Sequence, residues 1–422
     1  GDAFEMLQVP HVEEYDPAVV YSPEQYHSSS EEDSVLKLAI IIDGHRPFFN
    51  ALGRFIRTGP PRRHVTFVKG NHDVNLHWVA VQDLIREATG AIGGRRSLLN
   101  FEERRILREG IYVEHGNQYA AATDQIDDME EPHDRDRPGQ LAIPPGSWFV
   151  MDVFNQVERE RYWIDGVKPI SALVWYALAF DFPFAARAIA RLVRALPGIL
   201  DEVVFFLEAG GEAGLLQQLE DPAKVEGLAQ QYETDEAFRA RFNAELEAML
   251  SQTPVPDEAE SFALLSTGAD PVAMGDRVRD RINSSLFEIA AKRAKEEKVK
   301  LVTFGHTHEA VLEPLPDGGV YINSGTWTWI ADLGGDGKGT WRELFDHPER
   351  FTNDRRLSYV RINYDEAGEP SGELLSYEPG EKPNPEPSSG PLSLWERITG
   401  WFRRLWASLT GSEAETLGEV SQ

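Results

Sequence analysis

Short apolar segments that run directly into glycine, histidine, asparagine and aspartate constrain the fold of this chain more than any other feature. They are residues 64–70 (HVTFVKG), 110–116 (GIYVEHG), 298–308 (KVKLVTFGHTH) and 318–327 (GGVYINSGTW). β-Branched and aromatic residues favour strands, whereas glycine and asparagine favour turns. The sequence therefore predicts four strands, each followed by a polar loop.

Helical patterns separate these strands. In residues 35–57 apolar side chains recur every three or four positions, which predicts a single helix with Ser34 as its N-cap and Gly59 at its end. Residues 78–90 (WVAVQDLIREATG) show a similar pattern. Strands that alternate with helices indicate an α/β fold built on a layered sheet.

Composition divides the chain into a core in two parts and an insertion. We assign residues 1–122 and 298–365 to the two parts of one α/β core. Residues 123–297 begin acidic and proline-rich and continue in long helical patterns, which predicts a mainly helical insertion. The remaining sequence predicts a flexible linker (366–390), an amphipathic helix (391–410) and a tail (411–422).

The charge balance and the absence of cysteine exclude several classes of protein. The formal net charge of −28 argues against a nucleic-acid binder, because phosphate backbones attract basic surfaces. Without cysteine the chain can form no disulfide, thiolate metal site or cysteine nucleophile. No apolar run reaches the roughly 18 residues of a membrane-spanning helix. We expect a globular cytoplasmic protein that binds no nucleic acid.

Three of the polar loops carry side chains that suit divalent metals. They are residues 70–73 (GNHD), 114–117 (EHGN) and 305–308 (GHTH). Imidazole, amide and carboxylate groups bind manganese, iron or zinc, and loops at strand ends can converge on one point. Two ions ~3.5–4 Å apart can hold a phosphate and activate water. Such a pair needs a bridging carboxylate, and Asp2 is available for that role.

The segments GDAFE, GNHD, HG and GHTH, in this order over residues 1–308, resemble the motifs of the calcineurin-like metallophosphoesterase superfamily. The resemblance implies a four-layer sandwich, in which two mixed sheets are flanked by helices. It also implies two divalent metal ions, with manganese preferred and iron or zinc as alternatives. The reaction implied is hydrolysis of a phosphodiester, a pyrophosphate or a phosphomonoester by metal-activated water.

The resemblance assigns roles to individual residues. His72 would be the general acid or transition-state stabiliser, oriented by Asp73. The metal ligands would be Asp2, which bridges the two ions, Asn71, His115 and His306 on one ion, and His308 on the other.

Within this superfamily, GNHD, EHGNQY and GHTH are most similar to the group related to UDP-2,3-diacylglucosamine pyrophosphohydrolases. That similarity implies a phosphorylated small molecule or a lipid-linked substrate. The helical insertion then has two interpretations. It is either a structural cap that packs on the core, or a cap that accommodates acyl chains over the metal site.

The chain departs from the superfamily pattern at its start. The D-x-H motif should precede GDAFE, and the early D-x-H at residues 43–45 lies inside a predicted helix, so we interpret it as an ordinary helical segment. We expect that Gly1 was exposed by truncation of a longer protein. Glu5 replaces the last aspartate of G-D-x-x-D. The alternative function is therefore a non-catalytic or truncated relative that serves membrane or protein association.

Two further residues and one segment are candidates for contact with substrate or membrane. His77 either contacts substrate or is a polar residue at the start of a helix, and Asn323 either lines the pocket rim or lies in a simple turn. Residues 392–409 place tryptophan and arginine side chains on or near one helical face. Such a helix fits peripheral membrane contact, or docking onto the insertion or a partner subunit.

Overall fold

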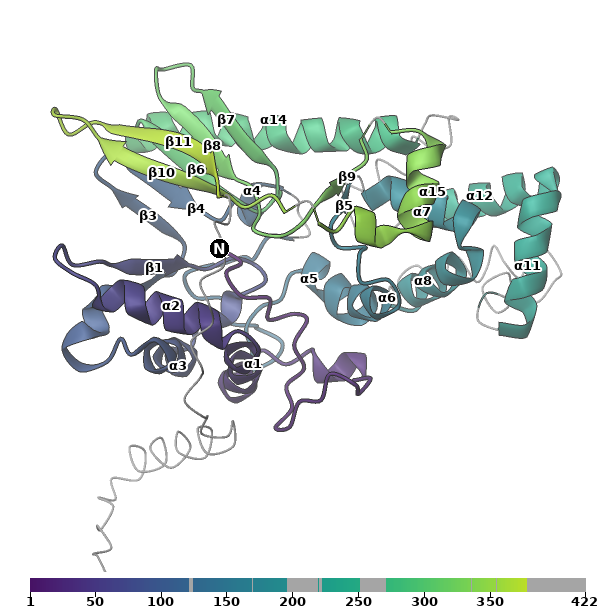
Figure 1. Ribbon diagram of the computed structural model, residues 1–422, viewed down its shortest axis with the longest axis horizontal. Helices are drawn as coiled ribbons and strands as arrows, with labels where there is room; N and C mark the ends of the chain where they lie inside the picture. The colour runs from purple at the N-terminus through teal and green to yellow at the C-terminus, as the bar shows by residue number, and fades with distance from the viewer. Residues whose placement is uncertain are drawn as a thin grey trace, which may run out of the picture.

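The computed structural model describes residues 1–120, 124–168, 170–195, 219, 222–250, 271–334, 336–353 and 355–377. The protein is mixed α/β, with helices and mixed sheets. Figure 1 shows two lobes, which we call the core lobe, with nearly all the strands, and the helical lobe. The long helix α14 (Pro271–Glu297) runs along both lobes.

The core lobe contains most of the strands. Its strands are β1 (Val65–Val68), β2 (Leu99–Glu102), β3 (Arg105–Arg108), β4 (Ile111–Glu114), β6 (Leu301–Phe304), β7 (Ala310–Pro314), β8 (Val320–Ser324), β10 (Ser358–Tyr364) and β11 (Pro370–Ser376). Its helices, besides part of α14, are η1 (Pro23–Gln25), α1 (Glu31–Gly44), α2 (Arg46–Arg57), η2 (Val74–His77), α3 (Val79–Thr89), η3 (Gly93–Leu98) and α4 (Asn117–Ala120).

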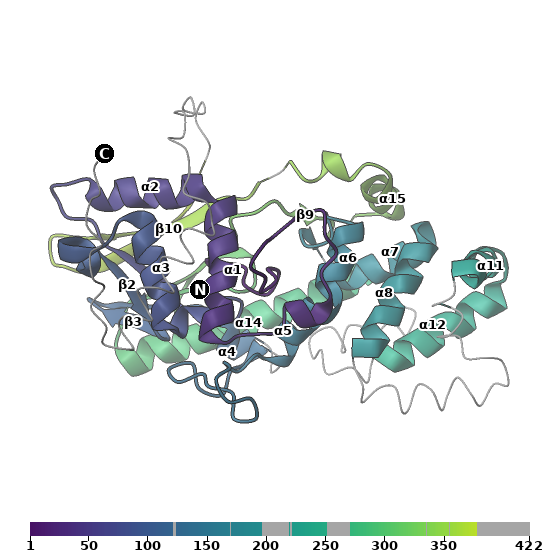
Figure 2. The same cartoon turned by 90° about the horizontal axis from the view of Figure 1, so that it is seen from below.

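The helical lobe lies at the other end of α14, as both views show (Figures 1 and 2). It contains α5 (Pro145–Phe149), η5 (Val150–Phe154), α6 (Asn155–Glu160), β5 (Val167–Lys168), α7 (Ile170–Phe180), α8 (Phe182–Ala195), α11 (Pro222–Thr234), α12 (Glu236–Leu250), β9 (Ala331–Asp332), α15 (Lys338–Asp346) and η6 (Pro348–Arg350). No helix among the described residues is both long enough and apolar enough to cross a membrane.

A five-stranded mixed sheet in the order β3-β4-β6-β8-β7 organises the core lobe. β4, β6 and β8 are parallel neighbours, and β3 and β7 pair antiparallel at the two edges. Because β4 and β6 are parallel, the loops that follow them leave the same edge of the sheet. This topology brings His115 and His306 close together.

Each face of this sheet is covered by a different layer. Tyr112, Val302 and Phe304 pack against Leu286 and Ala290 of α14 on one face. The hairpin β10–β11 covers the other face. The two layers are in close contact at Gly372, because a Cβ atom at this position would lie only 2.5 Å from Leu301 Cδ1. A separate parallel pair, β1–β2, packs with α1, α2 and α3 around the cluster that contains Leu38, Phe49, Val81, Ile85 and Leu99.

The helix predicted over residues 35–57 is in fact two helices. α1 ends at Gly44 and α2 begins at Arg46, with Pro47 in its first turn. Proline has no N–H to donate to the carbonyl four residues earlier, so α1 cannot continue through it. The N-cap prediction is also wrong, since Ser30 caps α1 by accepting a hydrogen bond from the N–H of Asp33.

The predicted boundaries of the insertion and the linker require correction. The predicted insertion, residues 123–297, contains the half of α14 that packs on the core sheet. The predicted second part of the core, residues 298–365, contains β9 and α15, which pack in the helical lobe. The predicted linker, residues 366–390, contains β11, which pairs with β10 in full antiparallel register. The predicted amphipathic helix and tail lie outside the described residues.

A buried lysine in α1 makes the stability of the core lobe depend on pH. Lys37 is 2% exposed, and its Nζ donates a hydrogen bond to the Tyr26 carbonyl at 2.5 Å. Burial lowers the pKa of Lys37 to about 7, although the nearby carboxylates of Asp33 and Glu5 oppose the shift. The folded protein therefore binds fewer protons than the unfolded chain between about pH 7 and the usual lysine pKa.

We expect the wild-type protein to gain stability relative to Lys37→Met as the pH rises from about 7 to 10.5. The unfolded chain binds the extra proton in this range, so the free energy of unfolding rises with pH, by roughly 4–5 kcal/mol in total. Below about pH 7 the difference between the two proteins should stay constant. Urea unfolding of both proteins at several pH values measures the difference, and parallel profiles would contradict the assignment.

Candidate metal centre

Asp2, Asn71, His115 and His306 come together from four separate segments. Asn71 follows β1, His115 follows β4 and His306 follows β6, while Asp2 belongs to the opening segment that lies between β1 and β4 (Figure 1). Ligand atoms of Asp2, His115 and His306 lie within 4.8 Å of one another. Oδ1 of Asn71 is 3.1 Å from Nε2 of His115. Four of the five predicted metal ligands therefore converge.

His115 Nε2 lies at the middle of this group. It is 2.8 Å from Asp2 Oδ2, 3.1 Å from Asn71 Oδ1 and 3.3 Å from His306 Nδ1. A neutral imidazole nitrogen carries at most one hydrogen, so it can donate to only one of these three atoms. The two atoms that do not receive this hydrogen lie just as close to His115 Nε2 but accept no hydrogen bond from it. A cation would satisfy all of them at once.

A carboxylate outside the group orients His306. Nε2 of His306 is 3.1 Å from Asp124 Oδ2, while Nδ1 faces His115. When Nε2–H donates to Asp124, Nδ1 keeps its lone pair directed toward the other ligands. This carboxylate–histidine contact is typical of metal-binding imidazoles. Asp124 belonged to no motif in the sequence.

The protonation states of the group suit a divalent metal. Burial lowers the pKa of His115 to about 4, despite the neighbouring Asp2 carboxylate, so the imidazole is neutral at pH 7. Burial opposes ionisation of Asp2, but its contacts with His115 and His72 hold its pKa well below the ordinary value. At neutral pH Asp2 is therefore an anion and His115 is neutral. Nε2–H can donate to Asp2, whereas the tautomer with its hydrogen on Nδ1 offers the Nε2 lone pair to a metal.

The loop after β1 is held against the opening segment by Asp73. Its carboxylate accepts hydrogen bonds from the backbone N–H of Gly70 at 2.7 Å and of Ala3 at 2.8 Å. Gly70 permits the close approach, because a Cβ there would lie 2.0 Å from Asp2 Oδ1. The backbone N–H of His72 donates to Asp2 Oδ1 at 2.9 Å. These bonds fix Asp2 and Asn71 relative to each other.

The predicted role of Asp73 in orienting His72 is wrong, because Glu5 has that role. Nδ1 of His72 is 2.6 Å from Glu5 Oε2, whereas Asp73 is fully buried against backbone N–H groups. Burial disfavours a charge on His72, but the carboxylates of Glu5 and Asp2 outweigh it and raise the pKa of His72 to about 10. The His72 side chain is 25% exposed, and Nε2 is the nitrogen left to face a ligand.

His308 lies near the group but is not part of it. Its ring interacts electrostatically with Asp2, His306 and His72, and burial together with the positive charge of Lys168 lowers its pKa to about 3. Among the described residues the converging ligand set at this point does not include His308. The arrangement therefore fits one metal ion more completely than two.

The backbone at this point is in an unusual conformation. Asp2, His306 and His308 have φ angles of 48°, 70° and 62°, in the left-handed region that residues other than glycine rarely adopt. Such conformations persist only where surrounding contacts enforce them, and they concentrate at functional sites. Two of these residues within the ligand group and a third beside it mark the site as a functional candidate.

The two predicted substrate-binding residues lie elsewhere. Asn323 is fully buried, and its Nδ2 donates to the Gly305 carbonyl at 2.9 Å and contacts Thr307 Oγ1 at 3.0 Å. It stabilises the loop after β6 and does not line the predicted rim of a pocket. His77 ends η2 and contacts Lys69, Glu103 and His133 instead of the Asp2 group. Residues 43–45 lie at the end of α1 and its junction with α2, where the Asp43 carboxylate pairs with Arg46, so the predicted helical segment ends here.

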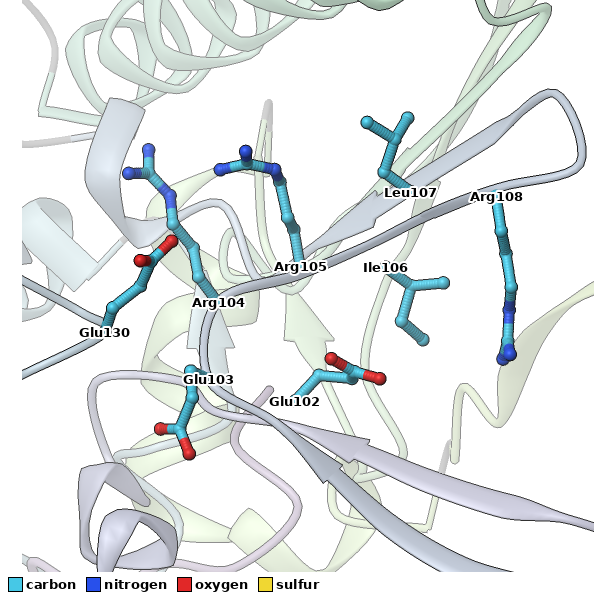
Figure 3. Close-up of a pocket in the computed structure, with 8 residues that line it drawn as sticks. All are labelled: Glu102, Glu103, Arg104, Arg105, Ile106, Leu107, Arg108 and Glu130. Carbon is cyan, nitrogen blue, oxygen red and sulfur yellow. The ribbon is translucent and has the colours of Figure 1, made fainter.

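A pocket of about 360 Å³ on β3 is separate from these ligands (Figure 3). Its lining includes three arginines and three glutamates, among them Arg104 and Glu130, which lie side by side in the figure. Because these charges balance, the pocket offers no net attraction for a phosphate.

No family model, curated protein or solved structure matches this chain.

Proposed function

We propose that this chain is a metal-dependent hydrolase of a phosphate ester or anhydride. One observation carries the proposal. Asp2, Asn71 and His306, which come from distant segments, surround His115 Nε2 at 2.8–3.3 Å. The single hydrogen of this nitrogen can satisfy only one of the three atoms, whereas a cation could bind all of them.

The donor set fits a divalent transition metal. Two imidazoles, an amide oxygen and a carboxylate suit manganese, iron or zinc, and the neutral His115 and anionic Asp2 are already in the forms that bind metal. When bound, the ion would supply Lewis-acid activation of water and of a phosphoryl oxygen. A second ion would rely on Asp2 and His308, so we propose one tightly held metal and a weaker second position.

The chain's own residues would handle the proton and the orientation of the substrate. His72 holds a proton at neutral pH and offers Nε2 to the leaving oxygen, while Glu5 fixes the ring through Nδ1. Asp73 holds the loop that carries both His72 and Asn71. These roles make His72 the general acid of the proposed reaction.

The layers of the core lobe support the metallophosphoesterase sandwich as the finer description of the fold. Helices α1–α3 cover β1–β2, and α14 covers the five-stranded sheet. The substrate we propose is a phosphorylated small molecule or a lipid-linked phosphate. The helical lobe is the part of the chain positioned to act as its cap, because Lys168 of β5 interacts with His308.

Metal content tests the proposal directly. After chelation and loading of the full chain with Mn²⁺, elemental analysis should find about one ion per chain in the wild type. The His306→Ala variant should lose that ion, whereas His347→Ala, which removes an exposed histidine that contacts Glu349, should keep it. Phosphate release from a phosphomonoester, a phosphodiester and a nucleoside diphosphate sugar should require the metal. A metal-free wild type would contradict the proposal.

A further inference from the structure

A second group of potential metal ligands lies outside the centre described above. His77, Glu131 and His133 place ligand atoms within 4.8 Å of one another. Nε2 of His133 is 3.6 Å from Glu131 Oε2, and the rings of His77 and His133 meet edge to face with centroids 5.1 Å apart. The group shares no residue with the Asp2–His115–His306 set.

The backbone that carries Glu131 and His133 is held in place by hydrogen bonds that do not involve these side chains. Asp128 Oδ1 accepts from the N–H of Glu131 at 3.1 Å. The N–H of Ala142 donates to the Pro132 carbonyl at 2.7 Å, and His133 forms a β-bridge with Leu141. Leu141 is anchored in turn by Ser29 Oγ. The backbone of the two ligand residues is therefore in place before any metal binds.

His77 is positioned independently from the other side. It ends η2, and its Nδ1 lies 3.3 Å from Lys69 Nζ and 3.4 Å from Glu103 Oε2. Lys69 Nζ can donate to Nδ1 only in one tautomer, whereas Glu103 Oε2 accepts from Nδ1–H in the other. In the tautomer with Nδ1–H, His77 donates to Glu103, Lys69 pairs with Glu103 alone, and the lone pair of Nε2 is available to a metal. This is the carboxylate–histidine pairing that metal-binding imidazoles commonly have.

The charge around the group can accommodate a cation. Lys69 is the nearest positive side chain, and Glu103 pairs with its Nζ. Glu130, the neighbour of Glu131, enters the same pocket as Glu103 (Figure 3). The arginines of this pocket balance its glutamates, so Glu131 is the additional carboxylate that a divalent cation would neutralise.

We infer that His77, Glu131 and His133 form a zinc site that is separate from the proposed catalytic centre. Two imidazoles and one carboxylate, with an open fourth position for water, are an established zinc ligand set. Magnesium and calcium prefer oxygen ligands, and this set has two nitrogens. Side chains that are 73% exposed at Glu131 and 50% exposed at His133 leave a path for the ion to enter.

A zinc ion at this site would connect two segments of the core lobe. Glu131 and His133 belong to the segment that follows Asp124, the partner of His306, and His77 closes the turn that follows Asn71 and His72. Zinc bound here would tie these two segments to each other across the surface. The inference does not rest on the proposed function, because it is argued from these three side chains alone.

Zinc titration of full-length variants tests the site. The background is His306→Ala, which removes a ligand of the proposed catalytic centre. In this background we expect one tightly bound Zn²⁺ per chain, measured against a chromophoric chelator, and Co²⁺ absorption bands typical of a four-coordinate site. Adding His133→Ala should weaken Zn²⁺ binding by more than about 100-fold, since loss of even an outer-shell partner costs ~10–100-fold.

The matched control is His347→Ala in the same background. His347 Nδ1 lies 3.4 Å from Glu349 Oε1, and its side chain is as exposed as that of His133. Among the described residues, however, His347 belongs to no group of three potential metal ligands. This variant should keep its zinc, and Glu131→Gln should weaken zinc binding as His133→Ala does. Equal zinc affinity with and without His133, or no zinc in a folded His306→Ala protein, would overturn the inference. Far-UV circular dichroism verifies folding of each variant.

Discussion

Replacing His115 with alanine should abolish metal-dependent phosphate release by the full chain. Nε2 of His115 contacts Asp2, Asn71 and His306, so its loss removes one ligand and leaves the others without the group that holds them together. We expect Mn²⁺ affinity to fall by more than about 100-fold. Hydrolysis should fall to the level that the wild type shows after chelation.

Two controls separate this effect from a general loss of structure. His115 is only 4% exposed, so alanine leaves a cavity, and thermal unfolding must show that the variant is folded. His306→Ala removes a different ligand and should cause the same loss of metal and activity. Wild-type turnover in folded His115→Ala would show that the group does not serve catalysis.

Replacing His72 with asparagine should lower kcat by about 10²–10⁴-fold while the protein keeps its metal. A general acid contributes a rate factor of this size, and asparagine cannot deliver a proton. The His72 side chain makes its charged contact with Glu5, and its backbone N–H, which the substitution preserves, contacts Asp2. Elemental analysis should therefore find the same metal content as in the wild type, in contrast to His115→Ala.

Glu5→Gln distinguishes a catalytic His72 from a structural one. Glutamine can still accept a hydrogen bond from Nδ1 but no longer supplies the negative charge that favours protonation of the ring. We expect a reduction in kcat of about 10-fold, within the range that outer-shell partners commonly produce, with KM little changed. If His72→Asn lowers kcat no more than Glu5→Gln does, proton donation by His72 is excluded.

Local patterns were sufficient to predict the strands that carry the centre. Val65–Val68, Ile111–Glu114, Leu301–Phe304 and Val320–Ser324 all lie within the predicted segments. Each is short, rich in β-branched or aromatic residues and ended by a glycine or polar turn, which is information that a few neighbouring residues contain. Three of the four converging ligands, Asn71, His115 and His306, lie in the turns after these strands, so their loops were predictable too.

The wrong predictions of secondary structure arise where the local sequence pattern fits two different structures. Apolar residues continue at helical spacing through His45, so only Pro47 signalled the break between α1 and α2. β11 was missed because its polar, glycine-containing sequence resembles a linker. Its strand conformation depends on pairing with β10 and on packing against Leu301.

The contacts that tune the site could not be predicted from spacing. Glu5 and His72 are separated by 67 residues, and Asp124 and His306 by 182 residues. Asp124 belongs to no motif, and the place of Glu5 at the end of GDAFE did not mark it as the partner of His72. Their roles depend on how the opening segment and the segment after α4 fold back onto the loops, which is set by tertiary packing.

The packing of α15 into the helical lobe has a consequence for the order in which the chain folds on the ribosome. Trp341 and Leu344 complete a cluster with Trp163, Phe182 and Phe242, which are synthesised far earlier. About 100 residues separate Phe242 from Trp341, so at ~5–20 residues per second the nascent lobe exposes apolar surface for roughly 5–20 s. During this interval the exposed apolar surface makes the unfinished lobe prone to aggregation. The same dependence means that the lobe cannot be excised as a continuous segment without losing the residues that close its interior.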